Sequence, residues 1–214
     1  MSIFRIIGSF KHQWFYFSLT KFILWLRMAQ PGFIKSFLFV KVKIGREEEA
    51  LEEIFKIPEV KEVHVVTGDF DLLCVLETEE TLVYPWKKVT DVVIGKIRKM
   101  DTLTDTRTII PFSSKIKEKS LVPVEKMVKA FIFVEVEPGK EKTIMKKIFN
   151  LNEVREVHFI PGKTDILAVL EVEKGLVTPH PEKILNIVLD EIRGIRGVKD
   201  TETIIPDRSK LKVG

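Results

Sequence analysis

The feature that most constrains the fold of this chain is a stretch that occurs twice. Residues 37–77 align with residues 131–171 at a constant offset of 94, with 19 identities in 41 positions. A second match, Thr-Ile-Ile-Pro, ends the copies at residues 111 and 206, an offset of 95. Self-similarity at one large period indicates a repeated structural unit. Two copies of about 75 residues predict a tandem duplication of one small domain.

Each copy has the same order of hydrophobic patterns. In the first copy, alternation typical of half-buried strands occupies 37–44, 60–66, 71–77 and 103–110. Apolar residues at helical spacing predict two helices, 46–56 and 86–100. The order strand, helix, strand, strand, helix, strand is that of a ferredoxin-like module. We therefore predict an α+β chain of two tandem ferredoxin-like (βαββαβ) modules, each with one antiparallel sheet covered by two helices.

Helices on one face of each sheet leave the other face to be buried elsewhere. Val40, Val63, Val65 and Val75 are candidates for this second face. A bare apolar sheet must be covered, and the other copy on the same chain is the nearest partner. We predict two sheets packed face to face as an intramolecular pseudo-dimer. The same alternation would place His64 on the opposite face, toward the helices or an edge.

Composition divides the chain into five parts. A polar, Lys-rich stretch separates the two repeats and is typical of a linker. The predicted parts are an apolar N-terminal segment 1–36, a first module 37–111, a linker 112–130, a second module 131–206 and a tail 207–214.

The N-terminal segment is rich in aromatic and aliphatic residues and carries five basic and no acidic side chains. Charged breaks at Lys11, Lys21 and Arg27 leave no apolar span of about 20 residues. An amphipathic helix on a membrane surface is one hypothesis for residues 1–30, and a packing helix is another. A third is that translation starts at Met28. A membrane partner is expected only if this segment belongs to the native protein.

Both modules are acidic, with charges of −4 and −2, although the whole chain carries +4. A nucleic-acid-binding face requires the reverse, so we expect no direct DNA contact by the modules. Cys74 is the single cysteine, which excludes an internal disulfide and favours a reducing, cytoplasmic compartment. The abundance of Lys and Glu is typical of heat-adapted proteins.

A glycine followed three residues later by an aspartate lies between the second and third strands of each copy. Glycine permits a tight hairpin turn, which places the aspartate at the mouth of the third strand. We predict a small-ligand site near these turns, with five candidate effector-binding residues: Gly68, Asp69, Asp71, Gly162 and Asp165. The alternative is that the aspartates only fix the turns.

The βαββαβ order and the Thr-Gly-Asp-Phe-Asp-Leu-Leu stretch at 67–73 resemble the effector-binding (RAM) domain of the Lrp/AsnC regulators. Residues 106–110, Thr-Arg-Thr-Ile-Ile, are similar to the final strand of that domain. The resemblance implies a non-catalytic regulatory protein whose domains pair through their sheets. It also implies that a small effector, an amino acid, binds near the Gly-x-x-Asp turns, and that the partner is a second copy or a DNA-binding relative.

The chain departs from that family in two places. The helix-turn-helix of the regulators is not recognisable in residues 1–36. In the second turn Pro161 replaces Thr67, and Lys163 replaces Asp69. The two turns are therefore not expected to bind the same ligand.

The alternative function is that of an enzyme on a dimeric α+β barrel, a haem-dependent or cofactor-free oxygenase. His64 and His158 occupy matching positions, and histidine can ligate haem or move a proton. The sequence has no His, Cys and carboxylate cluster with metal spacing, no Gly-rich phosphate loop and no Ser nucleophile motif. We expect neither a cofactor nor a metal, and we favour structural roles for both histidines.

Overall fold

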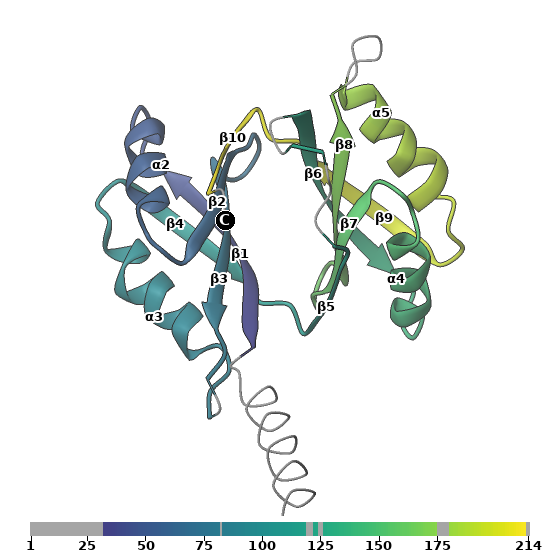
Figure 1. Cartoon of the computed structure of the whole chain (residues 1–214), viewed down its shortest axis with the longest axis horizontal. Coiled ribbons are helices and arrows are strands. Elements are labelled where there is room, and N and C mark those ends of the chain that lie inside the picture. The colour runs from purple at the N-terminus through teal and green to yellow at the C-terminus, as the bar shows by residue number, and fades with distance from the viewer. Residues whose placement is uncertain (1–31, 82, 119–121, 124–125, 175–179, 213–214) are drawn as a thin grey trace, which may run out of the picture.

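The computed structural model describes residues 32–81, 83–118, 122–123, 126–174 and 180–212, so that the hypotheses for residues 1–31 lie outside the described residues. Two five-stranded antiparallel sheets face each other, and the helices cover their outer faces (Figure 1). This arrangement confirms the predicted pair of ferredoxin-like modules. Within the described ranges, no helix has the length and hydropathy needed to cross a bilayer.

The first module follows the predicted order closely. Its elements are β1 (Phe33–Val42), α2 (Glu47–Phe55), β2 (Val60–Val65), β3 (Leu72–Glu79), α3 (Lys87–Gly95), the 3₁₀ helix η1 (Ile97–Lys99) and β4 (Leu103–Ile109). Three glutamates in the first turn of α2 suit the positive end of the helix dipole. The helix predicted over 86–100 ends earlier, at Gly95, because glycine is a poor helix former.

The second module repeats this plan. Its elements are β6 (Met127–Val136), α4 (Glu141–Phe149), β7 (Val154–Phe159), β8 (Ile166–Glu173), α5 (His180–Asn186), the π-helical segment η3 (Ile187–Ile192) and β9 (Val198–Ile204). The strand orders correspond, β2-β3-β1-β4 in one sheet and β7-β8-β6-β9 in the other. The register also corresponds, since Phe37 pairs with Val75 and Phe131 with Val169.

Each sheet is completed by a strand from the other module. Strand β5 (Ser113–Ile116) follows the first module but pairs with β7, and β10 (Arg208–Leu211) follows the second module but pairs with β2. The stretches 112–130 and 207–214, predicted as linker and tail, therefore each contain a strand. Both strands are short and polar, so they lack the apolar alternation that identifies a strand in sequence. The two exchanged strands interlock the modules.

The residues that the structure describes form three apolar cores. Two lie between a sheet and its helices, and the third lies between the two sheets, as predicted for a pseudo-dimer. This interface core consists of Phe37, Phe39, Val66, Leu73, Val75, Phe131, Phe133, Ile160, Leu167 and Val169.

The predicted assignment of sheet faces was largely wrong. Val40, Val63 and Val65 pack against the helices, and only Val75 lies in the interface core. His64 consequently lies between the sheets, where its ring contacts Phe131 with centroids 5.0 Å apart. Alternation determines which residues share a face, but it does not say which face the helices cover.

Candidate ligand site between the modules

The two predicted turn aspartates bind the backbone of a neighbouring strand. Asp71 Oδ2 accepts a hydrogen bond from the Val42 N–H at 2.7 Å, and Asp165 Oδ2 accepts one from the Val136 N–H at 3.1 Å. Each amide follows a register shift in its strand, where a bulge leaves a backbone donor to be satisfied. One carboxylate oxygen of each aspartate therefore fastens the hairpin to the first strand of its module.

The two glycines of these turns differ in conformation. Gly68 has φ +121°, a region that other residues rarely adopt. Gly162 lies outside this region, and a Cβ there would meet only the Ile160 carbonyl oxygen, at 3.7 Å, and the Thr164 carbonyl oxygen, at 3.9 Å. A side chain can therefore be introduced at position 162 without backbone strain, whereas one at position 68 is strained.

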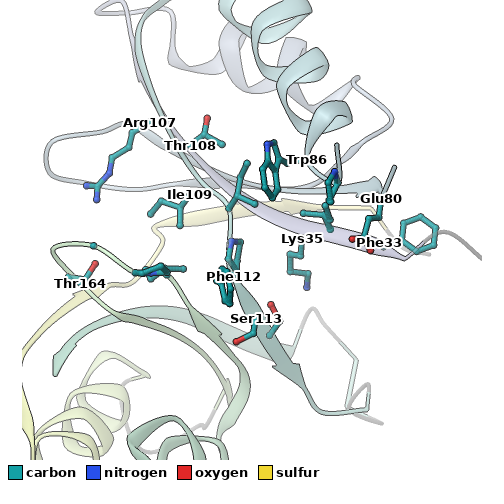
Figure 2. A pocket seen from close by; sticks show the side chains of 18 of the residues that line it. Phe33, Lys35, Glu80, Trp86, Arg107, Thr108, Ile109, Phe112, Ser113 and Thr164 are labelled. Carbon is teal, nitrogen blue, oxygen red and sulfur yellow. The ribbon is translucent and has the colours of Figure 1, made fainter. Parts of the chain in front are cut away.

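A cavity of about 810 Å³ lies beside the second turn (Figure 2). One wall is the turn at 160–164, from the second module. The others come from the start of β1, the residues just before α3, the end of β4 and the crossing into β5. This volume is typical of small-molecule sites. Residues of both modules therefore line the cavity, which lies at one of the two turns where the sequence predicts a ligand site.

Aromatic and aliphatic groups provide much of the cavity surface. Trp86, Ile109 and Phe112 all line it. Trp86 is 54% exposed and Phe112 is 81% exposed, so both rings remain available for contact with a ligand. Phe112 is held in place by its N–H, which donates to the Phe159 carbonyl oxygen at 2.8 Å.

Four charged residues line the cavity, namely Lys35, Glu80, Arg107 and Lys163. Lys35 is already occupied, because its ammonium lies 2.8 Å from Glu156 and 3.7 Å from Glu77. Arg107 and Lys163 form no ion pair or side-chain hydrogen bond with any residue in the described part of the chain. The free charge of the cavity is therefore mainly positive.

Only Gly162, of the five predicted site residues, lines this cavity. Asp165 lies just beyond the lining residues and holds the turn through the Val136 N–H. Gly68, Asp69 and Asp71 belong to the other hairpin and are not brought together with Gly162. Sequence reasoning did not predict that Trp86, Arg107 and Phe112 line this cavity. No local pattern marks them, because separate segments bring them to one place.

Two matching polar networks lie between the sheets. In one, Lys129 contacts Glu62 at 2.7 Å, and Glu62 contacts His64 Nε2 at 2.9 Å. His64 Nδ1 lies 2.7 Å from the hydroxyl of Ser209. The lysine and the serine come from the second module, and the glutamate and the histidine from the first. Each network therefore ties the modules together.

The second network repeats these contacts from the opposite modules. Lys35 contacts Glu156 at 2.8 Å, Glu156 contacts His158 Nε2 at 2.9 Å, and His158 Nδ1 lies 2.8 Å from the Ser114 hydroxyl. Both ring nitrogens of each histidine thus have a partner. These contacts fit the structural role favoured for the histidines. Among described residues, no group of three or more His, Cys, Asp and Glu could hold a metal.

The two glutamates are strongly acidic. Burial alone would raise the pKa of Glu62, but the hydrogen bond from His64 and the charge of Lys129 outweigh it and lower the pKa to about 2. Glu156 has the same balance with His158 and Lys35, and its pKa also falls to about 2. Attraction to Glu62 likewise outweighs burial at Lys129 and raises its pKa. Both networks are charged at neutral pH.

The fold and the paired sheets define a pair of ferredoxin-like modules, and comparison with known proteins identifies the family of the first. The family model described as the Lrp/AsnC ligand binding domain matches residues 35–121. This segment, which includes the first module, is therefore a domain of the Lrp/AsnC ligand-binding type.

The individual relatives match shorter segments of the chain. The HTH-type transcriptional regulator FL11 of Pyrococcus furiosus is 35% identical over 48 residues, which span 22% of this chain and 32% of that regulator. The structure of FFRP-DM1 is 36% identical, covers 36% of this chain and 96% of that one, and has a TM-score of 0.33.

A longer structural match is the siroheme decarboxylase NirDL. It covers 83% of this chain and 72% of that one with a TM-score of 0.57 and 12% identity. At this identity the likeness shows the fold alone: an enzyme can be built on two such modules, but a shared fold does not imply a shared function.

Proposed function

We propose that this protein is a non-catalytic, cytoplasmic regulatory protein that binds a small effector, an amino acid, in the cavity beside Gly162. The single observation that carries this proposal is the position of the cavity. It lies between the modules and against one of the two turns at which the family resemblance implies effector binding. The family match over residues 35–121 supports a regulatory rather than a catalytic role.

The chemistry of the cavity suits an amino acid. A zwitterion needs donors for its carboxylate and an acceptor for its ammonium group. Arg107 and Lys163 are donors without partners among the described residues, and the turn at 160–164 supplies carbonyl oxygens as acceptors for the ammonium group. Hydrogen bonds to charged groups contribute roughly 1.5–3 kcal/mol each. Trp86 and Phe112 offer apolar surface to the side chain of the ligand.

The turn aspartates have a supporting part in this proposal. Asp165 holds the turn that forms one wall of the cavity, so it positions Gly162 instead of contacting the effector. Gly68, Asp69 and Asp71 would form a second, separate site at the first turn. Effector binding would be transmitted through assembly with another copy or with a DNA-binding relative, as the match to a transcriptional regulator suggests.

Calorimetry of the full chain against the twenty amino acids tests the proposal. Gly162→Leu adds a side chain to the cavity wall without backbone strain and should abolish binding. Gly95→Leu is the matched control, because Gly95 lies in α3 away from the cavity lining and a Cβ there meets no atom within 4 Å. The control should bind as the parent does. Absence of binding to every amino acid, or equal binding by Gly162→Leu, would refute the proposed site.

An enzyme on the same fold is the second candidate, and the polar groups between the sheets are the observation that favours it. Their donors and acceptors are already paired, which leaves His64 and His158 without a free ring nitrogen. A haem titration followed by absorbance separates the two candidates. A shifted Soret band that His64→Ala and His158→Ala together remove would favour the enzyme.

A further inference from the structure

The two modules carry opposite charges at equivalent positions around their turns. Arg107 and Lys163 line the cavity beside Gly162. The residues at the same places in the other half, by the repeat offsets of 95 and 94, are Glu202 and Asp69. Two cations in one half are thus replaced by two anions in the other. This inversion occurs although the surrounding Thr-Ile-Ile-Pro residues are identical.

Strand register shows that these side chains share the inner side of the sheets. Arg107 of β4 pairs with Phe39 of β1, and Phe39 belongs to the interface core. Glu202 of β9 pairs with Phe133 of β6, which also belongs to it. Directly paired residues project from the same face of a sheet. Arg107 and Glu202 therefore both project toward the opposite module, at the rim of the interface.

Neither pair of charged side chains forms an ion pair or a side-chain hydrogen bond within the described part of the chain. No side chain in the described ranges pairs with Arg107 or Lys163, and the same holds for Asp69 and Glu202. By contrast, Lys35, which lines the same cavity, is held by Glu156. Unpaired charges around a concave, partly apolar site select a ligand of opposite charge.

Figure 2 shows Arg107 and Thr164 on one side of the cavity and Glu80 on the opposite side. On β1, the pairing partners of Arg107 and Glu79 lie six residues apart, about 20 Å, so a single amino acid cannot contact both Arg107 and Glu80 and lies at the cationic side. Building on the proposed function, we propose that the Gly162 cavity selects an acidic amino acid. Its carboxylates contact Arg107 and Lys163. The equivalent place beside Gly68, with Asp69 and Glu202, does not bind it.

The test is calorimetry of the full chain with glutamate, aspartate, glutarate, arginine, lysine and inorganic phosphate. Glutamate or aspartate should bind, and the basic amino acids should bind at least about tenfold more weakly because of the cationic rim. Glutarate, which lacks the ammonium group, should bind more weakly than glutamate, since the carbonyl oxygens of the turn at 160–164 then have no donor. Inorganic phosphate should not compete with glutamate, because it does not contact the apolar side chains that line the cavity.

Charge exchange between the halves provides the matched variants. Arg107→Glu with Lys163→Asp gives the cavity the residues of the other half, and it should weaken glutamate binding by about tenfold to a hundredfold. Glu202→Arg, the reverse change at the place in the other half that is equivalent to Arg107, is the control and should not weaken it. All three substituted side chains are exposed, and none has a partner among the described residues, so thermal unfolding should change little.

The outcomes separate this inference from the proposed function. Binding of a neutral or basic amino acid that Gly162→Leu abolishes, but that the charge exchange leaves unchanged, would overturn the acidic specificity alone. Binding of glutamate that is lost in the Glu202→Arg control would place the ligand at the other turn and also overturn the inference. No amino acid binding at all would overturn both.

Discussion

At the residue scale, the strongest constraints are the two buried glutamates between the sheets. Glu62 and Glu156 each join a histidine of their own module to a lysine of the other. Removing one member of a buried ion pair lowers the free energy of unfolding by more than an exposed ion pair contributes to it. The reason is that the remaining charge is left without a partner away from water. The stability of the pseudo-dimer should therefore be sensitive to these two carboxylates.

Glu62→Gln should lower the free energy of unfolding by about 3 kcal/mol, because the half-buried Lys129 loses its nearest anion and keeps only Glu171, at 3.5 Å. Glu156→Gln should have a similar effect through Lys35. Urea unfolding of each variant measures the change. Glu182→Gln, on the exposed surface of α5, is the control and should stay within about 0.5 kcal/mol of the parent. Equal stability of all variants would show that the networks contribute nothing.

The same glutamates predict a pH dependence. Their folded pKa of about 2 lies below the ordinary value of 4.5, so the unfolded chain binds protons first. The stability they contribute is present above pH 4.5 and is lost as the pH falls toward 2, by roughly 3 kcal/mol each. Unfolding curves across this window should show the loss in the parent. The Glu62→Gln, Glu156→Gln double variant should show a shallower dependence, and identical slopes would contradict the assignment.

At the scale of the elements, much of the plan follows from local pattern, and its exceptions have physical reasons. Strands such as β3 and helices such as α2 follow from apolar periodicity. Strands β5 and β10 do not, because they gain their stability by pairing with the other module and not from apolar burial of their own. The two faces of β2 were predicted the wrong way round, because alternation shows which residues share a face but not which face the helices cover.

Truncation after Pro206 should destabilise the protein by at least about 2 kcal/mol. It removes β10, exposes the edge of β2 and leaves the imidazole of His64 without the Ser209 hydroxyl. An uncovered edge strand also promotes pairing between molecules. Thermal unfolding and light scattering would record a lower melting temperature and self-association. Truncation of residues 213–214 alone is the control and should leave both unchanged.

At the scale of the whole molecule, the chain is a pseudo-dimer whose halves complete each other. The sequence predicts the two modules and their packing, since a repeated apolar face must be covered. It also draws attention to the turn at Gly162, which lines the cavity. The remaining walls, with Trp86, Arg107 and Phe112, depend on how the modules meet, and no local pattern contains that information.

The first module alone, residues 32–118, should form a homodimer. It contains every member of a polar network, namely Lys35, Glu62, His64 and Ser114, so two copies can rebuild both networks. Its own β5 can complete the sheet of the partner as it does in the full chain. Light scattering after size exclusion should give the mass of a dimer. Phe39→Asp, in the interface core, should give a monomer or an unfolded chain, and a soluble folded monomer of the parent module would contradict the prediction.

The central claim is that a small effector binds between the modules beside the second turn. Mapping of backbone amide chemical shifts on the full chain during a glutamate titration tests it most directly. The account predicts saturable shifts concentrated at residues 107–114 and 160–164, which line the cavity. Shifts confined to the first turn at 67–71, or no saturable shift with glutamate or any other amino acid, would contradict it.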